Sequence, residues 1–229
     1  MSNSLNICGM WLDKWKEKKY NYCMTKFLIQ SGGDYMATAF TEQEVQIIKT
    51  KLKEAARQFA VTTGVRKTSV DQLALAADIS KGAFYKFYPS KEALFFELLE
   101  DMHTEIYQAS AEVLRQNANL PPAERAAQAV LTACSKMEES GMMDFMERDV
   151  PHLLRKIPAE IQEKHYHSDE THIKGILADT DLNPVGGIDL AAATVRGLFL
   201  TISHREEIGN LYPEVLRTLV YGACGRLFP

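Results

Sequence analysis

The sequence predicts an all-α protein of about nine helices, in which a small helix-turn-helix domain precedes a larger helical domain. Apolar side chains recur at spacings of three and four residues almost throughout the chain from Thr41 onward, which is the pattern of amphipathic helices. No segment alternates convincingly with the period of two that marks a half-buried strand. Caps, glycines and prolines divide the pattern into separate helices. With 229 residues, 46% of them hydrophobic, the chain is long enough to bury a core.

The composition argues against a secreted or membrane-spanning protein. The four cysteines stand at positions 8, 23, 134 and 224 without CxxC spacing, so neither a zinc cluster nor a disulfide framework is indicated. The chain has no run of 18 apolar residues, and its N-terminus lacks the basic-then-apolar pattern of a signal peptide. We expect a cytoplasmic protein that has no membrane partner and needs no cofactor.

The net charge of −4 conceals an asymmetry between two parts of the chain. Residues 36–90 contain eight Lys and Arg against five Asp and Glu, whereas residues 91–229 contain thirteen against twenty-two. A mildly basic unit is therefore followed by an acidic one, either by chance or because the first unit faces a polyanion. We treat the two ranges as two domains.

Residues 1–35 differ from the rest and are rich in Asn, Lys, Tyr and Trp. Trp11 and Trp15 stand four residues apart and could share one face of a membrane-surface helix. Alternatively, native translation begins at Met36, because codons for Gly32-Gly33-Asp34 can spell a strong ribosome-binding sequence at a suitable distance from it. We therefore expect an extension that is absent from the native protein or disordered.

Three helices are expected in the N-terminal domain. The TEQE motif at 41–44 is a capping box and begins the first helix, which ends near Gly64. A second capping box, SVDQ at 69–72, begins a short helix. Ser80 caps the third helix, and Pro89 ends it because proline disfavours helix in the residue before it.

The larger domain begins with a long helix that Ser90 caps. Pro122 and Pro158 lie at the start of further helices. Gly141 separates the first of these helices from a Met-rich segment, which contains Met142, Met143 and Met146. Two strongly apolar helices complete the chain. The expected helices cover residues 91 to at least 113, 122–140, 158–178, 188–204 and 212–227. A further short helix is expected to end at about residue 154.

The two short helices have the residue pattern of a helix-turn-helix, whose helices meet at about 90–120°. Ala74 provides the small side chain at the point where they nearly touch. Asp78 occupies a turn position that often adopts a left-handed backbone, which Asp tolerates better than most residues. The side expected to be buried consists of Leu73, Ala77, Ile79, Phe84 and Phe87.

The other side of the third helix combines lysine, tyrosine and small residues. Lysine donates to guanine O6 and N7, alanine contacts the thymine methyl, and tyrosine hydroxyls and lysines bind phosphate. This side therefore predicts a DNA-reading surface, and the alternative is a plain helical hairpin whose aromatic residues serve packing alone. The residues expected to face outward are Lys81, Gly82, Ala83, Tyr85, Lys86 and Tyr88.

The segment TSVDQLALAADISKGAFYKFYPSKEALF at 68–95 resembles the DNA-binding segment of TetR-type (tetracycline-repressor-like) transcriptional regulators. The resemblance runs from residue 42 through Leu94, and the helical layout extends it to the rest of the chain. Asp78, Phe84 and the order Phe87-Tyr88 depart from the usual glycine, leucine and Tyr-Phe. The resemblance implies contacts with a double-stranded DNA operator from Thr68, Ser69, Ser80, Lys81, Gly82, Ala83, Tyr85, Lys86, Tyr88 and Lys91.

The resemblance also implies a homodimer whose interface is built by the helices at 188–204 and 212–227, because a two-fold protein matches a palindromic operator. The sequence agrees independently. Both helices, IDLAAATVRGLFLTI and EVLRTLVYGACGRLF, mix small residues with large apolar ones on nearly all sides, as buried helices do. The alternative is that both belong to the core of a monomer.

The acidic domain contains no GxSxG, P-loop or HExxH motif, and we do not expect an enzyme. His165, Asp169 and His172 share one helix face and form a weak candidate for a metal site; the alternative is a hydrated polar face.

By resemblance, the acidic domain would hold a small-molecule effector in a pocket, although Met and Phe at helical spacing also serve as plain core. Arg196 is a charge within an otherwise apolar helix, so it requires a carboxylate from Asp189, Glu147 or a ligand. The candidate pocket residues are Tyr107, Cys134, Met137, Met142, Phe145, Met146, His152, Tyr166, Arg196 and Phe199.

These expectations combine into a homodimeric repressor that binds a palindromic operator through the helix at 80–88 and releases it when a ligand binds. One alternative is an activator or a ligand-independent DNA-binding regulator of the same fold. The other is a helical interaction module that does not bind DNA.

Overall fold

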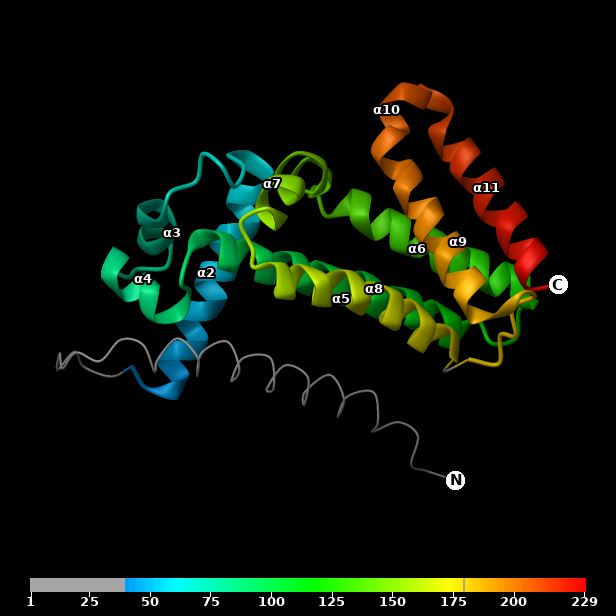
Figure 1. Cartoon of the computed structure of the whole chain (residues 1–229), viewed down its shortest axis with the longest axis horizontal. Coiled ribbons are helices and arrows are strands. Elements are labelled where there is room, and N and C mark those ends of the chain that lie inside the picture. The colour runs from blue at the N-terminus through cyan, green and yellow to red at the C-terminus, as the bar shows by residue number, and fades with distance from the viewer. Residues whose placement is uncertain (1–39, 179) are drawn as a thin grey trace. The chain divides into compact units, whose positions relative to one another are not determined.

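Helices account for most of residues 40–178 and 180–229, the part of the chain that this computed structural model describes, without the side chains of 164 and 166–170 (Figure 1). No strand occurs in these residues, so the predicted all-α fold is confirmed. The extension at 1–35 and the proposed start at Met36 lie outside the described residues. Within the same ranges, no helix is long and apolar enough to cross a membrane.

The first three described helices begin where the capping residues predict. Ser69 accepts a hydrogen bond from the Gln72 N–H, and the Gln72 side chain accepts one from the Ser69 N–H at 2.8 Å, which completes a capping box. Ser80 accepts from the Ala83 N–H at 3.1 Å. The bounds are α2 Glu42–Thr62, α3 Val70–Ala76 and α4 Lys81–Phe87.

Ion pairs fix α2 along the long helix α5 (Lys91–Gln116). The Lys53 ammonium lies 3.2 Å from a Glu97 carboxylate oxygen and 2.5 Å from an Asp101 oxygen. One turn further along α2, Arg57 lies 2.6 Å from Glu105. Burial alone lowers the pKa of Lys53, but the hydrogen bond to Asp101 and the charge of Glu97 outweigh it and raise this pKa above its ordinary value.

The C-terminal part has one apolar core, which lies between α5 and four further helices. Leu114 of α5, Ala127 and Val130 of α6, Leu198 of α9 and Val220 of α11 are all buried in it. In Figure 1, α9 and α11 lie side by side as a hairpin. The bounds are α6 Pro122–Glu139, α8 Ala159–Ala178, α9 Gly187–Leu200 and α11 Tyr212–Leu227.

The connections in this part differ from the expected long helices. The Met-rich segment continues into a π-helical turn, η1 (Phe145–Asp149), before α7 (Val150–Leu154). The helix expected to reach residue 204 ends at Leu200, and two 3-10 turns and the short α10 connect it to α11. Gly209 has a φ of +77°, a conformation that ends a right-handed helix. The connecting elements are η2 Thr201–His204, α10 Arg205–Ile208 and η3 Gly209–Leu211.

Candidate nucleic-acid interface and ligand cavity

Helix α4 buries its aromatic side and exposes a polar side. Phe84 is 0% exposed and Phe87 is also buried, as the sequence predicts, whereas Tyr85 is 48% exposed. Lys81, Gly82 and Lys86 are exposed as well, and Ala83 is half-buried. The seven-residue helix therefore presents two cationic side chains, a phenol and the exposed backbone at Gly82 on one side.

The turn between α3 and α4 has the left-handed residue that the pattern predicts. Asp78 has a φ of +57° and is the only described non-glycine residue with a positive φ. The Ile79 N–H bonds back to the Ala74 carbonyl at 3.0 Å and closes the turn. The Asp78 carboxylate lies 2.6 Å from the Lys51 ammonium, and this hydrogen bond lowers the pKa of the Asp78 carboxyl below its ordinary value.

Three residues that are expected to contact DNA make contacts within the protein in this structure. Thr68 is 1% exposed, and its hydroxyl donates to the Gly64 carbonyl at 2.7 Å. Tyr88, expected to face outward, is 4% exposed and its ring lies 6.0 Å from that of Phe84. The prediction that Tyr88 faces outward was wrong, because α4 ends at Phe87 and the capping residue Tyr88 turns inward, next to Phe84.

Lys91 is the third of these residues. Its ammonium donates to the carbonyls of Val65 at 2.7 Å, Arg66 at 3.2 Å and Thr68 at 2.6 Å. Three acceptors match the three protons of an ammonium group. In this structure Lys91 therefore fixes the loop before α3 rather than pointing toward solvent. Ser69 and Ser80 are exposed but use their hydroxyls as helix caps.

Two contacts of this region had no signal in the sequence. The Lys81 ammonium lies 2.8 Å from the Asp71 carboxylate across the turn, and this hydrogen bond raises the pKa of Lys81. The buried Asp149 of η1 accepts a hydrogen bond from the Val65 N–H at 2.8 Å. Each pair joins residues far apart in sequence, so neither periodicity nor spacing could indicate it.

Comparisons with known proteins agree with this geometry. Residues 52–98, from α2 through α4 into α5, match the family model of "Bacterial regulatory proteins, tetR family". This segment of the chain is similar to the DNA-binding segment of that family. Two Bacillus subtilis proteins, both named uncharacterized HTH-type transcriptional regulators, are similar to part of this chain. YuxN is 47% identical over 58 residues, and YdgC is 33% identical over 73 residues.

These matches are partial, whereas the fold likeness to solved structures extends over most of the chain. The matches cover 25% of this chain and 18% of YuxN, and 32% of this chain and 37% of YdgC. A protein of Mesorhizobium loti named as a TetR-family regulator has a TM-score of 0.62 at 16% identity, over 81% of this chain and 96% of its own. A transcriptional regulator of Cytophaga hutchinsonii has a TM-score of 0.56 at 14% identity, over 78% and 97%.

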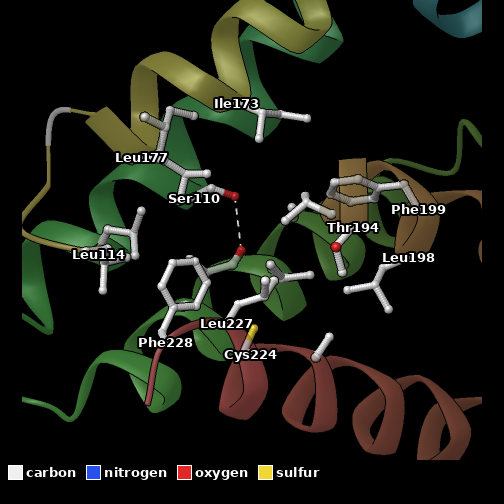
Figure 2. A pocket seen from close by; sticks show the side chains of 18 of the residues that line it. Ser110, Leu114, Ile173, Leu177, Thr194, Leu198, Phe199, Cys224, Leu227 and Phe228 are labelled. Carbon is white, nitrogen blue, oxygen red and sulfur yellow. Dashed lines mark hydrogen bonds between the residues drawn. The ribbon is translucent and has the colours of Figure 1, made fainter. Parts of the chain in front are cut away.

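The C-terminal part of the protein contains an apolar cavity of about 60 Å³ between α5, α6, α8, α9 and α11 (Figure 2). None of the described side chains that line it is charged. Ser110 donates its hydroxyl proton to the Ala129 carbonyl at 3.0 Å, and Thr194 donates to the Leu190 carbonyl at 2.8 Å. Both hydroxyls are therefore already used as donors, and the remaining wall is almost entirely aliphatic and aromatic.

Among the predicted pocket residues whose side chains are described, Tyr107 and Phe199 line this cavity. The others lie in the core or elsewhere, because the helical spacing that suggested a pocket also describes plain core. Met142 and Phe145 are fully buried, Cys134 is 2% exposed, and Met137 packs against the core. Met146 and His152 are half-buried outside the cavity, Arg196 lies on an exposed side of α9, and the Tyr166 side chain is not described.

The carboxylates proposed for Arg196 have other partners. Asp189 lies 2.7 Å from the Lys174 ammonium, and Glu147 forms an ion pair with Arg205. The environment of Arg196 is thus the outer side of α9 rather than a buried charge site.

The histidines considered for a metal make other contacts. His165 is 5% exposed, and its Nδ1 lies 2.6 Å from a Glu100 oxygen. His172 instead stacks on Tyr107 with ring centroids 5.1 Å apart. The side chain of Asp169, the third candidate, lies outside the described residues. Among the side chains that are described, no group of His, Cys, Asp and Glu is arranged to hold a metal ion.

Proposed function

We propose that this protein is a homodimeric transcriptional repressor that binds a palindromic DNA operator through α4 and releases it when an uncharged, apolar small molecule enters the C-terminal cavity. The observation that carries the proposal is the exposed side of α4. A short helix anchored by Phe84 and Phe87 presents Lys81, Tyr85 and Lys86 outward, next to a turn with helix-turn-helix geometry.

The net positive charge of residues 36–90 supports DNA as the partner, since phosphate contacts provide most of the affinity of such proteins and make it salt-dependent. The test is footprinting of the full chain on the DNA upstream of its own gene, followed by titrations at several salt concentrations. We expect Lys86→Ala and Tyr85→Ala to weaken binding at least tenfold, a loss of about 1.4 kcal/mol. Lys136→Ala, an exposed lysine of α6, is the control and should bind as the wild type does.

The dimer is supported by residues that the monomer leaves exposed on α9 and α11. Leu190, Ala193, Gly197 and Leu200 of α9 are exposed and follow one another at spacings of three and four. Gly222 and Gly225 of α11 are also exposed. A methyl group added to any of the three glycines would contact no other part of the monomer. Glycine within a helix costs about 1 kcal/mol relative to alanine, and close approach of a second copy would explain this cost.

Gly222→Leu tests the dimer because the new side chain fits the monomer but would separate two closely packed helices. We expect a protein of unchanged helicity that sediments as a monomer and has lost cooperative operator binding. Gly175→Leu is the matched control, since Gly175 lies on the exposed side of α8 with equally open space. If both variants sediment as the wild type does, α9 and α11 do not form the interface.

The lining of the cavity supports the class of effector. A charged ligand would lose its hydration without gaining a partner there, whereas an apolar ligand would gain contacts with an aliphatic wall. The cavity of about 60 Å³ is smaller than most ligand sites, so binding requires it to widen, and such a change could reach the DNA-binding helices. To move the protein from mostly DNA-bound to mostly released, the effector must bind the released conformation more tightly than the DNA-binding one by about 5.5 kcal/mol.

A cavity-filling variant tests the effector site. Ala129→Phe should abolish release by apolar compounds while operator binding remains. Ala159→Phe, at the exposed start of α8, adds the same group outside the cavity and outside the proposed dimer surface, and should leave release by apolar compounds unchanged. Release of the operator by Ala129→Phe at the wild-type ligand concentration would contradict this site. The position of the footprint relative to the promoter separates a repressor from an activator.

A further inference from the structure

The Asp71–Lys81 pair joins the first turns of α3 and α4 on the exposed side of the helix-turn-helix. The distance between the Lys81 Nζ and the Asp71 Oδ2 is 2.8 Å, and the two side chains are 55% and 64% exposed. Ion pairs with this exposure contribute little to stability. An acidic residue beside the recognition helix also repels phosphate. The first turn of α3 favours an acidic residue, but this preference does not require the carboxylate to pair with a lysine of α4.

We propose that Asp71 and Lys81 together read one G·C base pair in each operator half-site, with Lys81 donating to the guanine and Asp71 accepting from the cytosine N4 amino group. This inference rests on the proposed DNA-binding function. It assigns Asp71 as a specificity-determining residue, although it lies in the helix before the recognition helix.

The spacing of the pair matches the edge of a G·C base pair. In the major groove, guanine presents the acceptors N7 and O6, and cytosine presents its N4 donor next to O6. O6 and N4 are hydrogen-bonded to each other, so they lie about 2.9 Å apart. The Lys81 and Asp71 atoms, 2.8 Å apart, present a donor beside an acceptor at the same spacing. Each protein atom therefore faces a base atom of the opposite kind.

The other base pairs match less well. A T·A pair in the same orientation also presents an acceptor, O4, beside a donor, N6. However, the thymine methyl then replaces the second acceptor that guanine N7 offers Lys81, and adenine N7 lies beside the Asp71 carboxylate, where two acceptors repel. C·G and A·T place a donor opposite the ammonium and an acceptor opposite the carboxylate. The expected order of affinity is G·C, then T·A, then the two reversed pairs.

Asp71→Asn tests the assignment because it keeps the shape of the side chain and removes its strict acceptor character. An amide offers either a donor or an acceptor, so the preference for cytosine should weaken while that of Lys81 for guanine remains. Asp78→Asn is the matched control. It removes the same charge and breaks the same kind of exposed lysine pair, with Lys51 at 2.6 Å, and asparagine tolerates the left-handed turn.

The full-length wild type, Asp71→Asn and Asp78→Asn are each used to select duplexes from a randomised DNA pool, and the enriched duplex is then titrated with single base-pair changes. For the wild type and Asp78→Asn we expect a G·C pair at one symmetric position and a loss of about tenfold or more when it is reversed, within the range of a base-edge contact. Asp71→Asn should lose the part of this penalty that the cytosine contact contributes and keep the part that Lys81 contributes. Inosine in place of guanine keeps N7 and O6 and should bind as guanine does.

Three results would overturn the inference. An Asp71→Asn protein that gains affinity equally on every duplex, with a steeper salt dependence, would make Asp71 a general charge rather than a reader. A G·C preference that survives Asp71→Asn unchanged would assign the reading to another residue. A wild type that selects no DNA would refute the proposed function and this inference together. Thermal unfolding of each variant confirms that the fold is kept.

Discussion

The Asp149 carboxylate accepts a hydrogen bond from the Val65 N–H at 2.8 Å and joins η1 of the C-terminal part to the loop before α3. Asp149 is 6% exposed, and π-helical turns such as η1 occur often at functional sites. Three carbonyls of the same loop accept hydrogen bonds from the Lys91 ammonium of α5. The start of α3 is therefore fixed from two helices of the protein body.

Asp149→Ala should destabilise the protein by about 1–3 kcal/mol, because the buried Val65 N–H would lose its acceptor. Urea unfolding followed by circular dichroism measures this change. Asp144→Ala is the control, since Asp144 is 59% exposed and pairs only with Arg148 one turn away. That variant should lie within about 0.5 kcal/mol of the wild type. Equal stability of the two variants would show that the Asp149 contact contributes nothing.

Gly64→Ala should be destabilising for two separable reasons. Gly64 has a φ of +79°, which costs a residue with a side chain about 1–2 kcal/mol. An added Cβ would also lie 2.9 Å from an Asp149 carboxylate oxygen. A double-mutant cycle with Asp149→Ala separates them, because the backbone cost remains in both backgrounds while the close approach disappears in one. We expect Gly64→Ala to cost about 1 kcal/mol less in the Asp149→Ala background.

Asp78→Gly should keep or raise stability without loss of DNA binding. Glycine adopts the φ of +57° without steric cost, and the pair with Lys51 that it removes is exposed and contributes little. Asp78→Ala removes the same pair but keeps a Cβ, so it should be less stable than Asp78→Gly by about 1 kcal/mol. Chemical unfolding of the three proteins gives the order. A large loss for glycine would contradict the left-handed turn.

Stability should fall in alkaline solution as two buried thiols ionise. Burial raises the pKa of Cys134 to about 12 and that of Cys224 to about 11. Their folded-state pKa values exceed those in the unfolded chain, near 8.5. The folded state therefore retains protons that the unfolded state releases, and stability present below about pH 8.5 is lost progressively toward pH 11–12. Unfolding measured from pH 7 to 10.5 should show this decline.

The double variant Cys134→Ala, Cys224→Ala is the control for the alkaline decline. It should lose stability less steeply with pH, even if its stability at pH 7 is lower because of the smaller side chains. The same thiols should react with a disulfide reagent at pH 8 only after the protein unfolds. Rapid reaction in the folded state would contradict their burial.

Features set by local interactions could be predicted from the sequence. The caps at Ser69 and Ser80, the buried Phe84 and Phe87, and the left-handed Asp78 all depend on neighbours within a few residues. The periodicity that predicted the helices follows from the same local geometry. The outward side of α4 was predicted because its two sides differ in polarity.

Features set by distant contacts could not be predicted. Lys91 reaches the carbonyls of the loop before α3 from α5, and Asp149 reaches that loop from 84 residues away. The cavity lies where α11 packs against α6, so most of the residues proposed from helical spacing belong to the core instead. No pattern in the sequence marked the 3-10 turns that follow Leu200.

The contacts of Lys91 bear on chemical mapping of the DNA complex. Amine-directed acylating reagents attack a lysine nitrogen that is free to react, whereas the Lys91 ammonium donates its protons to three carbonyls. Lys91 should therefore resist modification with or without DNA, whereas Lys86 should lose reactivity only when a duplex is added. If acylation were measured on the DNA-bound sample alone, the protection of Lys91 would be mistaken for a DNA contact. The reactivity of each lysine must therefore be compared with its reactivity in the free protein.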